Sequence, residues 1–335
     1  MIKFRTEYKP EKSHITLSPR IPVIFIGSCF SNNMVIKMRE ALWEGINPTG
    51  TLYNPQSIAS ALRLCLLSLF PESEFEKSLF LSNNKYYSWL FDSKLSSYCA
   101  PDSMSGFRFM REKLLSTISR GAPLIVSFGT SYAYFLKGRD NTPVGNCHKQ
   151  PEDMFDRRFL QQNEIVEVWS KLLKDLKKRF PSLKVIFTVS PVRHLKDGFT
   201  GNSRSKANLL LSVEQICRNH SFCDYFPAYE ILTDDLRDYR FYASDLLHPS
   251  DEAIDYIWEM FIKTYLDDEG QSRLREGEKL RKFLNHHPLP DSSRLIPDDI
   301  LKQSVSRREE LVKSLIAFLD NDISFWPELK ELINI

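Results

Sequence analysis

Short apolar runs typical of buried strands alternate with helical segments from residue 20 to about residue 265. The strand-like runs are rich in β-branched and aromatic residues and lie at residues 23–26, 124–128, 185–189 and 222–226. The helical segments lie between or after them, at residues 31–43, 105–119, 163–179, 205–219 and 250–266. This alternation predicts an α/β fold, a three-layer α/β/α sandwich around a central parallel sheet of four or five strands.

Three stretches interrupt the alternation. Residues 79–100 are rich in aromatic side chains and predict an inserted β-hairpin or loop, and residues 132–146 predict a second insertion, a loop. Residues 269–335 have helical patterns without strands. We therefore expect one α/β domain over residues 1–268, which contains both insertions, and a helical C-terminal extension over residues 269–335.

Charge and composition exclude several classes of protein. The 45 Lys and Arg residues against 43 Asp and Glu give a formal net charge of +2, so there is no electrostatic reason to expect nucleic acid or an anionic membrane as partner. No run approaches the roughly 20 apolar residues of a membrane span, and no apolar stretch follows the charges at the amino terminus. The six cysteines show neither a Cys-x-x-Cys pair nor zinc-finger spacing. We expect a cytoplasmic protein with reduced thiols, no metal site and no cofactor.

The sharpest motif is Gly27-Ser28-Cys29, where the first strand meets the first helix. In a doubly wound sheet, ligands bind at the carboxyl ends of the strands. A serine there faces the cleft, and the N-terminus of the following helix directs N–H groups toward an oxyanion. Ser28 is therefore a candidate nucleophile; the alternative is that it only caps the helix.

A second motif, Asp245-x-x-His248, follows the last strand and directly precedes the helix expected over residues 250–266. An aspartate three residues before a histidine can accept the bond from its Nδ1–H, which leaves Nε2 free to act as general base. The alternative is a surface turn in which Ser250 or Asp251 caps the helix.

The two motifs together have the chain order of SGNH (GDSL-like) hydrolases. Gly27-Ser28-Cys29-Phe30 resembles the name motif of the GSCFA family, a bacterial group placed in that superfamily, although Ser31 replaces the alanine at its fifth position. Further similar stretches lie at residues 47–55, 128–131, 146–149 and 190–194. The resemblance implies a flavodoxin-like SGNH fold, with Ser28, His248 and Asp245 as the catalytic triad.

The resemblance also implies an oxyanion hole. The backbone N–H of Cys29 and the glycine of the second sequence block, here Gly50, would be two of its donors. The asparagine of the third block is absent, because the corresponding run is Gly129-Thr130-Ser131. We favour Asn146 as the replacement donor, with the hydroxyls of Thr130 and Ser131 as alternatives.

Other residues near the expected strand ends are candidates for the substrate pocket. His148, Arg193 and His194 could contact an anionic or sugar substrate, or they could be hydrogen-bonded scaffolding. Cys29 and Cys147 are alternative nucleophiles, Cys29 because a helix N-terminus lowers a thiol pKa and Cys147 because it stands beside His148. We expect the Cys29 side chain to point away from the cleft if Ser28 faces it.

The sequence as a whole predicts a serine esterase that removes a small acyl group from a carbohydrate or other polar metabolite. The partner expected is thus a small-molecule ester. The alternative is a non-catalytic binding or scaffolding protein that retains the SGNH fold, and the absent third-block asparagine favours it. No motif indicates an oligomeric state.

Overall fold

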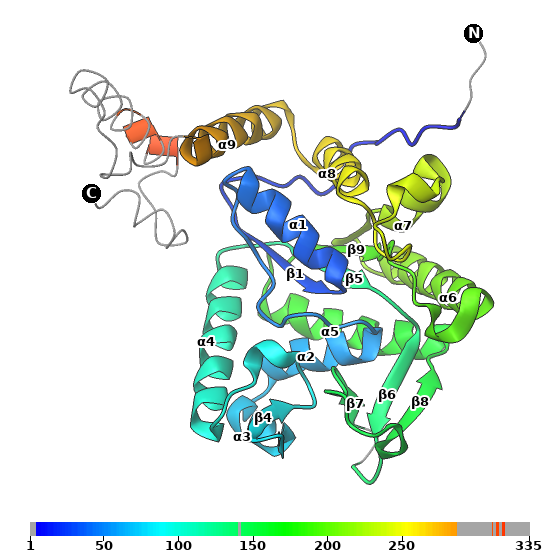
Figure 1. Ribbon diagram of the computed structural model, residues 1–335. Coiled ribbons are helices and arrows are strands. Elements are labelled where there is room, and N and C mark those ends of the chain that lie inside the picture. The colour runs from blue at the N-terminus through cyan, green and yellow to red at the C-terminus, as the bar shows by residue number, and fades with distance from the viewer. Residues whose placement is uncertain (1–4, 140–141, 287–309, 311–312, 315–316, 319–335) are drawn as a thin grey trace, which may run out of the picture.

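A parallel sheet of five strands lies at the centre of the protein, as the computed structural model in Figure 1 shows. The structure describes residues 5–139, 142–286, 310, 313–314 and 317–318. The strand order is β10-β9-β5-β1-β2, with bounds Cys223–Tyr225, Val185–Val189, Leu124–Phe128, Val23–Gly27 and Gly45–Ile46. This is a doubly wound order, and it reverses between β1 and β5, the place where such sheets bind ligands.

Alternate residues of the strands face two separate cores. Ile24 and Ile26 belong to one core, whereas Val23 and Phe25 belong to the other. The helices of the first core are α2, α4, α5 and α6, at Pro55–Leu67, Ala100–Ser119, Gln162–Arg179 and Gly198–Asn219. The second core includes α1 and α8, at Cys29–Glu40 and Asp251–Tyr265. Helices on both faces explain why the strands are apolar throughout, and they confirm the predicted three-layer α/β/α fold.

Two excursions leave the central sheet. The first follows α3 (Pro71–Ser78) and contains the antiparallel hairpin of β3 (Leu79–Ser82) and β4 (Lys85–Ser88), as expected for residues 79–100. The second is not the loop expected over residues 132–146. It is an antiparallel sheet in the order β7-β6-β8, with bounds Pro143–Val144, Tyr132–Leu136 and Phe155–Phe159.

The chain after β10 lies outside the central sheet. It forms a short helix α7 (Ala228–Glu230), a π-helical turn (Ile231–Leu236) and then α8. Helix α9 (Asp268–His286) begins the predicted C-terminal extension and contacts α1 (Figure 1). Most of the extension lies outside the described residues, and the domain boundary at residue 268 stays a prediction.

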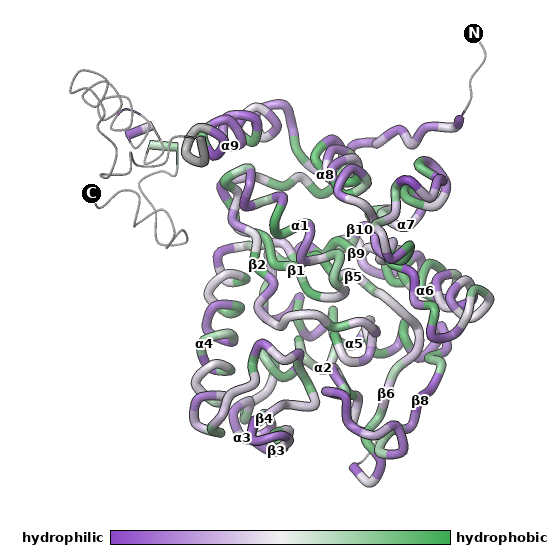
Figure 2. The backbone as a smooth tube through the Cα atoms, viewed as in Figure 1, coloured by the Kyte–Doolittle hydropathy of each residue, from purple (hydrophilic) through white to green (hydrophobic). Residues whose placement is uncertain are grey.

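Hydropathy follows this architecture (Figure 2). Hydrophobic positions gather along β1, β5 and β9, whereas α9 is mostly hydrophilic. Leu274 of α9 joins the core around α1 and α8. Among the described residues, no helix combines the length and apolar character needed to cross a membrane.

Candidate active site

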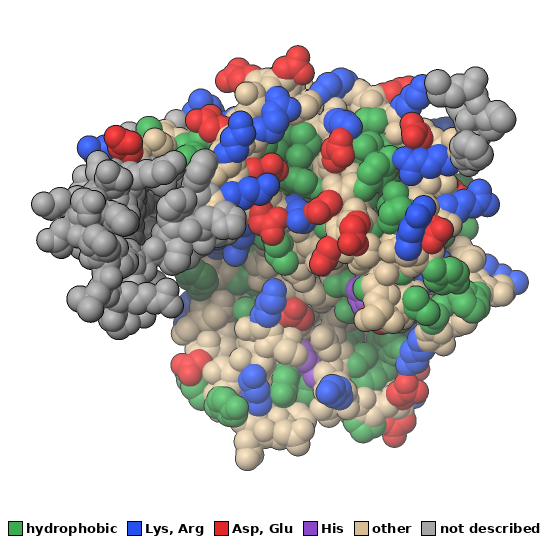
Figure 3. All heavy atoms as spheres, turned by 45° about the horizontal axis from the view of Figure 1, so that its top comes forward, with side chains coloured by type: hydrophobic (Ala, Val, Ile, Leu, Met, Phe, Trp, Pro, Cys, Tyr) green, Lys and Arg blue, Asp and Glu red, His purple; other side chains and the backbone are tan. Residues whose placement is uncertain are grey.

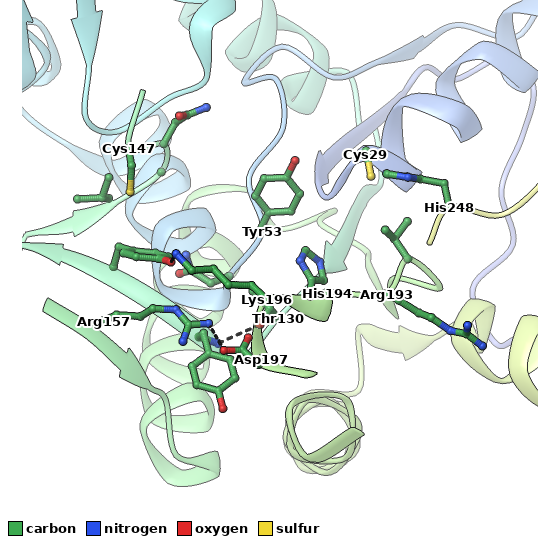
Figure 4. Close-up of a pocket in the computed structure, with 17 residues that line it drawn as sticks. Cys29, Tyr53, Thr130, Cys147, Arg157, Arg193, His194, Lys196, Asp197 and His248 are labelled. Carbon is green, nitrogen blue, oxygen red and sulfur yellow. Dashed lines mark hydrogen bonds and ion pairs between the residues drawn. The ribbon is translucent and has the colours of Figure 1, made fainter. Parts of the chain in front are cut away.

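A cavity of about 370 Å³ opens at the carboxyl ends of β1, β5 and β9 (Figure 4). Its lining includes one residue that follows each strand, namely Cys29, Thr130 and His194. His248, from the segment before α8, also lines it. Because it opens at the carboxyl ends of these strands, the cavity lies where a doubly wound sheet binds its ligand. On the face of the molecule drawn in Figure 3, acidic and basic side chains are interspersed.

Ser28 is fully buried and does not line this cavity. Its Oγ lies 2.9 Å from Ser127 Oγ on β5, and its N–H donates to Ser127 O at 3.1 Å. Gly27 explains this placement: its φ is +138°, and a Cβ there would lie 2.1 Å from Ser127 O. Such a close approach of β1 to β5 requires glycine. The structure thus does not bring Ser28 together with His248, and the side chain of Ser28 makes no helix-capping bond either.

Cys29 is the first residue of α1, and its side chain lines the cavity. In Figure 4 its sulfur points toward the imidazole of His248. The thiol was expected to point away from the cleft only if Ser28 faces it, and that condition is not met, because Ser28 does not line the cavity. Burial raises the pKa of the Cys29 thiol, whereas the N–H groups of Phe30 and Cys29 and the charge of Lys206 act to lower it. The first N–H groups of a helix have no partner within the helix, and they favour negative charge.

Asp245 and His248 make the contact that their spacing indicates. Asp245 Oδ2 lies 2.6 Å from His248 Nδ1, which leaves Nε2 as the second ring nitrogen. Asp245 Oδ1 accepts the N–H groups of His248 at 3.0 Å and of Leu247 at 2.9 Å. These backbone bonds, with the bond from the imidazole, lower the pKa of Asp245 to about 2. A charged carboxylate therefore fixes the orientation and the tautomer of His248 at neutral pH.

The candidate oxyanion donors lie in different surroundings. Gly50 is buried and does not line the cavity, and a Cβ on it would fall 1.9 Å from Asp92 Oδ2. Asn146 lines the cavity, where its Oδ1 accepts the N–H of His148 at 2.7 Å and its amide nitrogen remains a donor. Figure 4 places the neighbouring Cys147 across the cavity from Cys29. Asn146 thus lies across the cavity from the helix N-terminus that holds the thiol, whereas Gly50 directly precedes Thr51, which forms a bridge with Gly27 at the end of β1.

Two polar candidates belong to the scaffold rather than to the lining. Ser131 is buried and hydrogen-bonded to Ser205 through both its N–H and its Oγ. His148 Nε2 contacts Ser88 O at 2.8 Å, which ties its loop to the β3–β4 hairpin. Neither residue lines the cavity, whereas Thr130 does and also contacts Ser205 Oγ at 3.2 Å.

Arg193 and His194 both line the cavity but differ in their orientation. The guanidinium of Arg193 lies 4.1 Å from the centre of the Tyr242 ring, and Figure 4 shows it pointing away from the cavity. His194 packs edge-on against Tyr53, with ring centroids 5.5 Å apart. Burial, with the charges of Lys206 and His248, lowers the pKa of His194 to about 4, so its ring is neutral at pH 7.

The far wall of the cavity consists of residues that the sequence did not indicate. Arg157 of β8 forms an ion pair with Asp197 and lies 4.1 Å above the ring of Tyr132. Lys196 Nζ contacts Tyr134 Oη at 3.0 Å. In Figure 4 the ion pair of Arg157 and Asp197 lies across the cavity from Cys29 and His248. In β6 Tyr132 and Tyr134 alternate with apolar residues, a pattern that could have indicated that both face the same side of a strand. The charged sequence of β8 carried no such pattern.

Comparison with known proteins identifies the family. The GSCFA family model matches residues 22–261. Among solved structures, the chain is similar to a protein from Streptococcus pneumonia described as a proposed platelet activating factor, at 12% identity and a TM-score of 0.38, over 75% of this chain and 85% of that chain. It is also similar to an acetyl xylan esterase (Est2A) from the rumen bacterium Butyrivibrio proteoclasticus, at 12% identity and a TM-score of 0.36, over 79% of this chain and 64% of that chain. A search of curated proteins found no match. Because the family model covers most of the chain, the protein belongs to the GSCFA family.

Proposed function

We propose that this protein is a hydrolase of SGNH type that cleaves a small acyl ester with Cys29, rather than Ser28, as its nucleophile. One observation carries the proposal: the thiol of Cys29 lies at a helix N-terminus and shares one cavity with His248. The carboxylate of Asp245 already holds His248 in the orientation of a general base. A nucleophile, a base and a group that orients the base are the parts required for covalent catalysis.

The chemistry follows from these positions. His248 Nε2 takes the proton of Cys29 as sulfur attacks the ester carbonyl, and Asp245 stabilises the resulting imidazolium. The N–H of Cys29 donates to the oxyanion, aided by the positive end of α1. The alcohol leaves with the proton from His248, and the acyl group remains on sulfur as a thioester. Water, deprotonated by His248, then releases the acid and restores the thiol.

The lining of the cavity supports a polar substrate. Its volume of about 370 Å³ suits a small ligand. The far wall offers tyrosine rings and the charged groups of Arg157 and Lys196. Aromatic faces and charged hydrogen-bond donors suit the alcohol portion of a carbohydrate or similar metabolite better than a long acyl chain. Asn146, on the same side as Cys147, would contact this portion.

The test is hydrolysis of 4-nitrophenyl acetate by matched variants. Cys29→Ala should lower kcat/KM at least about a thousandfold, because no residual nucleophile remains. Ser28→Ala should retain activity within about tenfold, since it removes only the bond to Ser127 Oγ. Cys147→Ala is the control for a thiol that lines the same cavity. Loss of activity with Ser28→Ala and its retention with Cys29→Ala would instead assign the serine as nucleophile.

A second outcome bears on the non-catalytic alternative. If the folded wild type hydrolyses neither this ester nor a panel of acetylated sugars, and Cys29 forms no acyl adduct, the hydrolase proposal fails. Binding of the same sugars, measured by calorimetry, would then favour a binding protein with this fold.

A further inference from the structure

His194 lines the cavity but has no part in the chemistry proposed above for Cys29 and His248. Its ring packs edge-on against Tyr53, and a Cβ on Gly129 would lie 3.0 Å from its Nε2. The space for the imidazole therefore depends on the glycine that directly follows β5.

The strand ends that carry this glycine and this histidine are tied together from inside the protein. The buried Lys206 donates through Nζ to Gly129 O, directly after β5, and to Ser190 O, directly after β9, each at 2.7 Å. The His194 ring thus packs between segments that are fixed by hydrogen bonds, and its position needs no rearrangement when a substrate enters.

A series of contacts joins this ring to the end of β1, where Cys29 begins α1. Leu52 N–H donates to Gly27 O at 2.8 Å, directly beside the Gly27-Ser28-Cys29 junction. The next residue, Tyr53, packs on His194 with ring centroids 5.5 Å apart. Figure 4 accordingly shows the His194 ring on the same side of the cavity as Cys29.

A second set of contacts joins His194 to the segment of His248. Arg193 N–H donates to Leu247 O at 3.1 Å, so the two histidines each follow a residue of one backbone hydrogen bond. Asn202 Oδ1 accepts the N–H of His194 at 3.0 Å and holds the backbone there. Both histidines line the cavity. The His194 side chain is therefore placed next to the nucleophile and the base of the proposed reaction.

Only one of the two ring nitrogens of His194 can act in the cavity. Nε2 is buried and has no hydrogen-bond partner among the residues that the structure describes. In protein interiors an N–H without an acceptor is rarer than an acceptor without a donor, which favours the tautomer with its proton on Nδ1. The pKa of His194, lowered to about 4 by burial and by the charges of Lys206 and His248, keeps the ring neutral at pH 7. His194 thus offers the cavity one N–H from a neutral ring.

We propose that His194 is a catalytic residue that donates its Nδ1–H to the oxyanion, together with the N–H of Cys29. The oxyanion forms when sulfur bonds to the acyl carbon and the π electrons of the carbonyl move to oxygen. It disappears when the carbonyl forms again and the bond to the alcohol breaks, with the proton of His248 going to the alcohol. The ring of His194 keeps its own proton throughout.

This role would replace the donor that the third sequence block lacks. Asn146 lies across the cavity from Cys29, whereas the imidazole of His194 lies on the same side as the thiol. A donor that is already oriented before the negative charge appears stabilises the transition state most effectively. The inference rests on the proposed function, with Cys29 as nucleophile.

The test compares two reactions of Cys29 that differ in whether an oxyanion forms. Acylation by 4-nitrophenyl acetate passes through one, whereas alkylation by iodoacetamide is a displacement at a saturated carbon. His194→Phe should slow acylation about a hundredfold or more, because one oxyanion donor is worth that much, and should leave the rate of alkylation within about threefold. His194→Asn, whose amide N–H lies near the position of Nδ1, should recover most of the acylation rate.

His220→Phe is the matched control. The Nε2 of His220 is likewise buried without a partner in the described part of the chain, but this residue is not in the lining of the cavity. Its substitution should change neither reaction. A folded His194→Phe protein that is acylated at the wild-type rate would overturn the inference. An equal loss of acylation and alkylation would also overturn it, since His194 would then act on the thiol itself.

The failure of the inference and the failure of the proposed function give different results. If Cys29→Ala abolishes hydrolysis but His194→Phe leaves acylation unchanged, only the inference fails. If Cys29→Ala retains hydrolysis, the proposed function itself fails.

A measurement on the wild type keeps the test decisive if His194→Phe does not fold. Nitrogen NMR of the protein with isotope-labelled histidine reports which ring nitrogen holds the proton. The signals of His194, identified by their loss in His194→Asn, should show the proton on Nδ1 at pH 7. A proton on Nε2 would overturn the inference.

Discussion

The direction of two adjacent side chains decides which one can act in the cavity. Gly27, at φ +138°, brings the chain against Ser127 on β5, so Ser28 enters the space between two strands. Cys29 then begins α1 and faces the cavity. The sequence motif predicts a nucleophile at this junction. It does not indicate which of the two residues faces the substrate, because that depends on the pairing of β1 with β5.

Asp245→Asn tests the second half of the proposed triad. The substitution preserves the shape but removes the charge that orients His248 and stabilises its protonated form. We expect kcat/KM for 4-nitrophenyl acetate to fall about a hundredfold or more, with little change in melting temperature, because Asp245 is exposed. Glu252→Gln, which removes an exposed carboxylate from the first turn of α8, serves as control. Equal activity of both variants would show that His248 needs no orienting carboxylate.

At the scale of elements, the sequence indicated the structures that have strong local patterns. The strands β1, β5, β9 and β10 were predicted to within two residues at each end. Every residue of β1, β5 and β9 is buried and most are apolar, which gives these three strands a strong local pattern. Strand β8 was missed, since three of its five residues are exposed charged side chains. Only its pairing with β6 defines it. The burial of Lys206 was equally hidden, because it depends on carbonyls far away in the sequence.

The packing of α9 on α1 can be tested with two glycines. A Cβ at Gly277 would lie 2.2 Å from Ala41 O, whereas a Cβ at Gly106 in α4 would meet only Leu95 Cδ2 at 3.8 Å. Alanine in an exposed helix position stabilises by about 1 kcal/mol relative to glycine. Gly106→Ala should therefore raise the free energy of unfolding in urea, whereas Gly277→Ala should lower it. A gain for Gly277→Ala equal to that for Gly106→Ala would mean that α9 is free of α1.

In the molecule as a whole, one apolar core lies on each face of the central sheet. Several histidines are held largely out of water as neutral rings. Burial lowers the pKa of His148, His194 and His220, in the case of His194 to about 4. An unfolded chain protonates these rings near their ordinary pKa of about 6.5. Between these pH values the unfolded state binds more protons than the folded state, so stability falls as the pH is lowered.

Urea unfolding at pH 7 and at pH 4.5 measures this effect. Between these two pH values His194 alone should account for about 2 kcal/mol of stability lost, because its pKa is about 4 in the folded protein and about 6.5 in the unfolded chain. The window lies above the range where Asp245, with its pKa of about 2, loses its charge. His194→Gln should therefore reduce the difference between the two pH values. An unchanged difference would show that His194 is protonated in the folded protein.

The most direct test of the central claim is the chemical nature of the acyl-enzyme. The protein would be mixed with an activated acetyl ester and quenched in acid within the first turnovers. Its intact mass would then be measured by mass spectrometry before and after exposure to neutral hydroxylamine. Neutral hydroxylamine cleaves thioesters readily and oxygen esters slowly. The account predicts one acetyl group that hydroxylamine removes, and that is absent from Cys29→Ala. An acetyl group that resists hydroxylamine, and that is lost in Ser28→Ala, would contradict it.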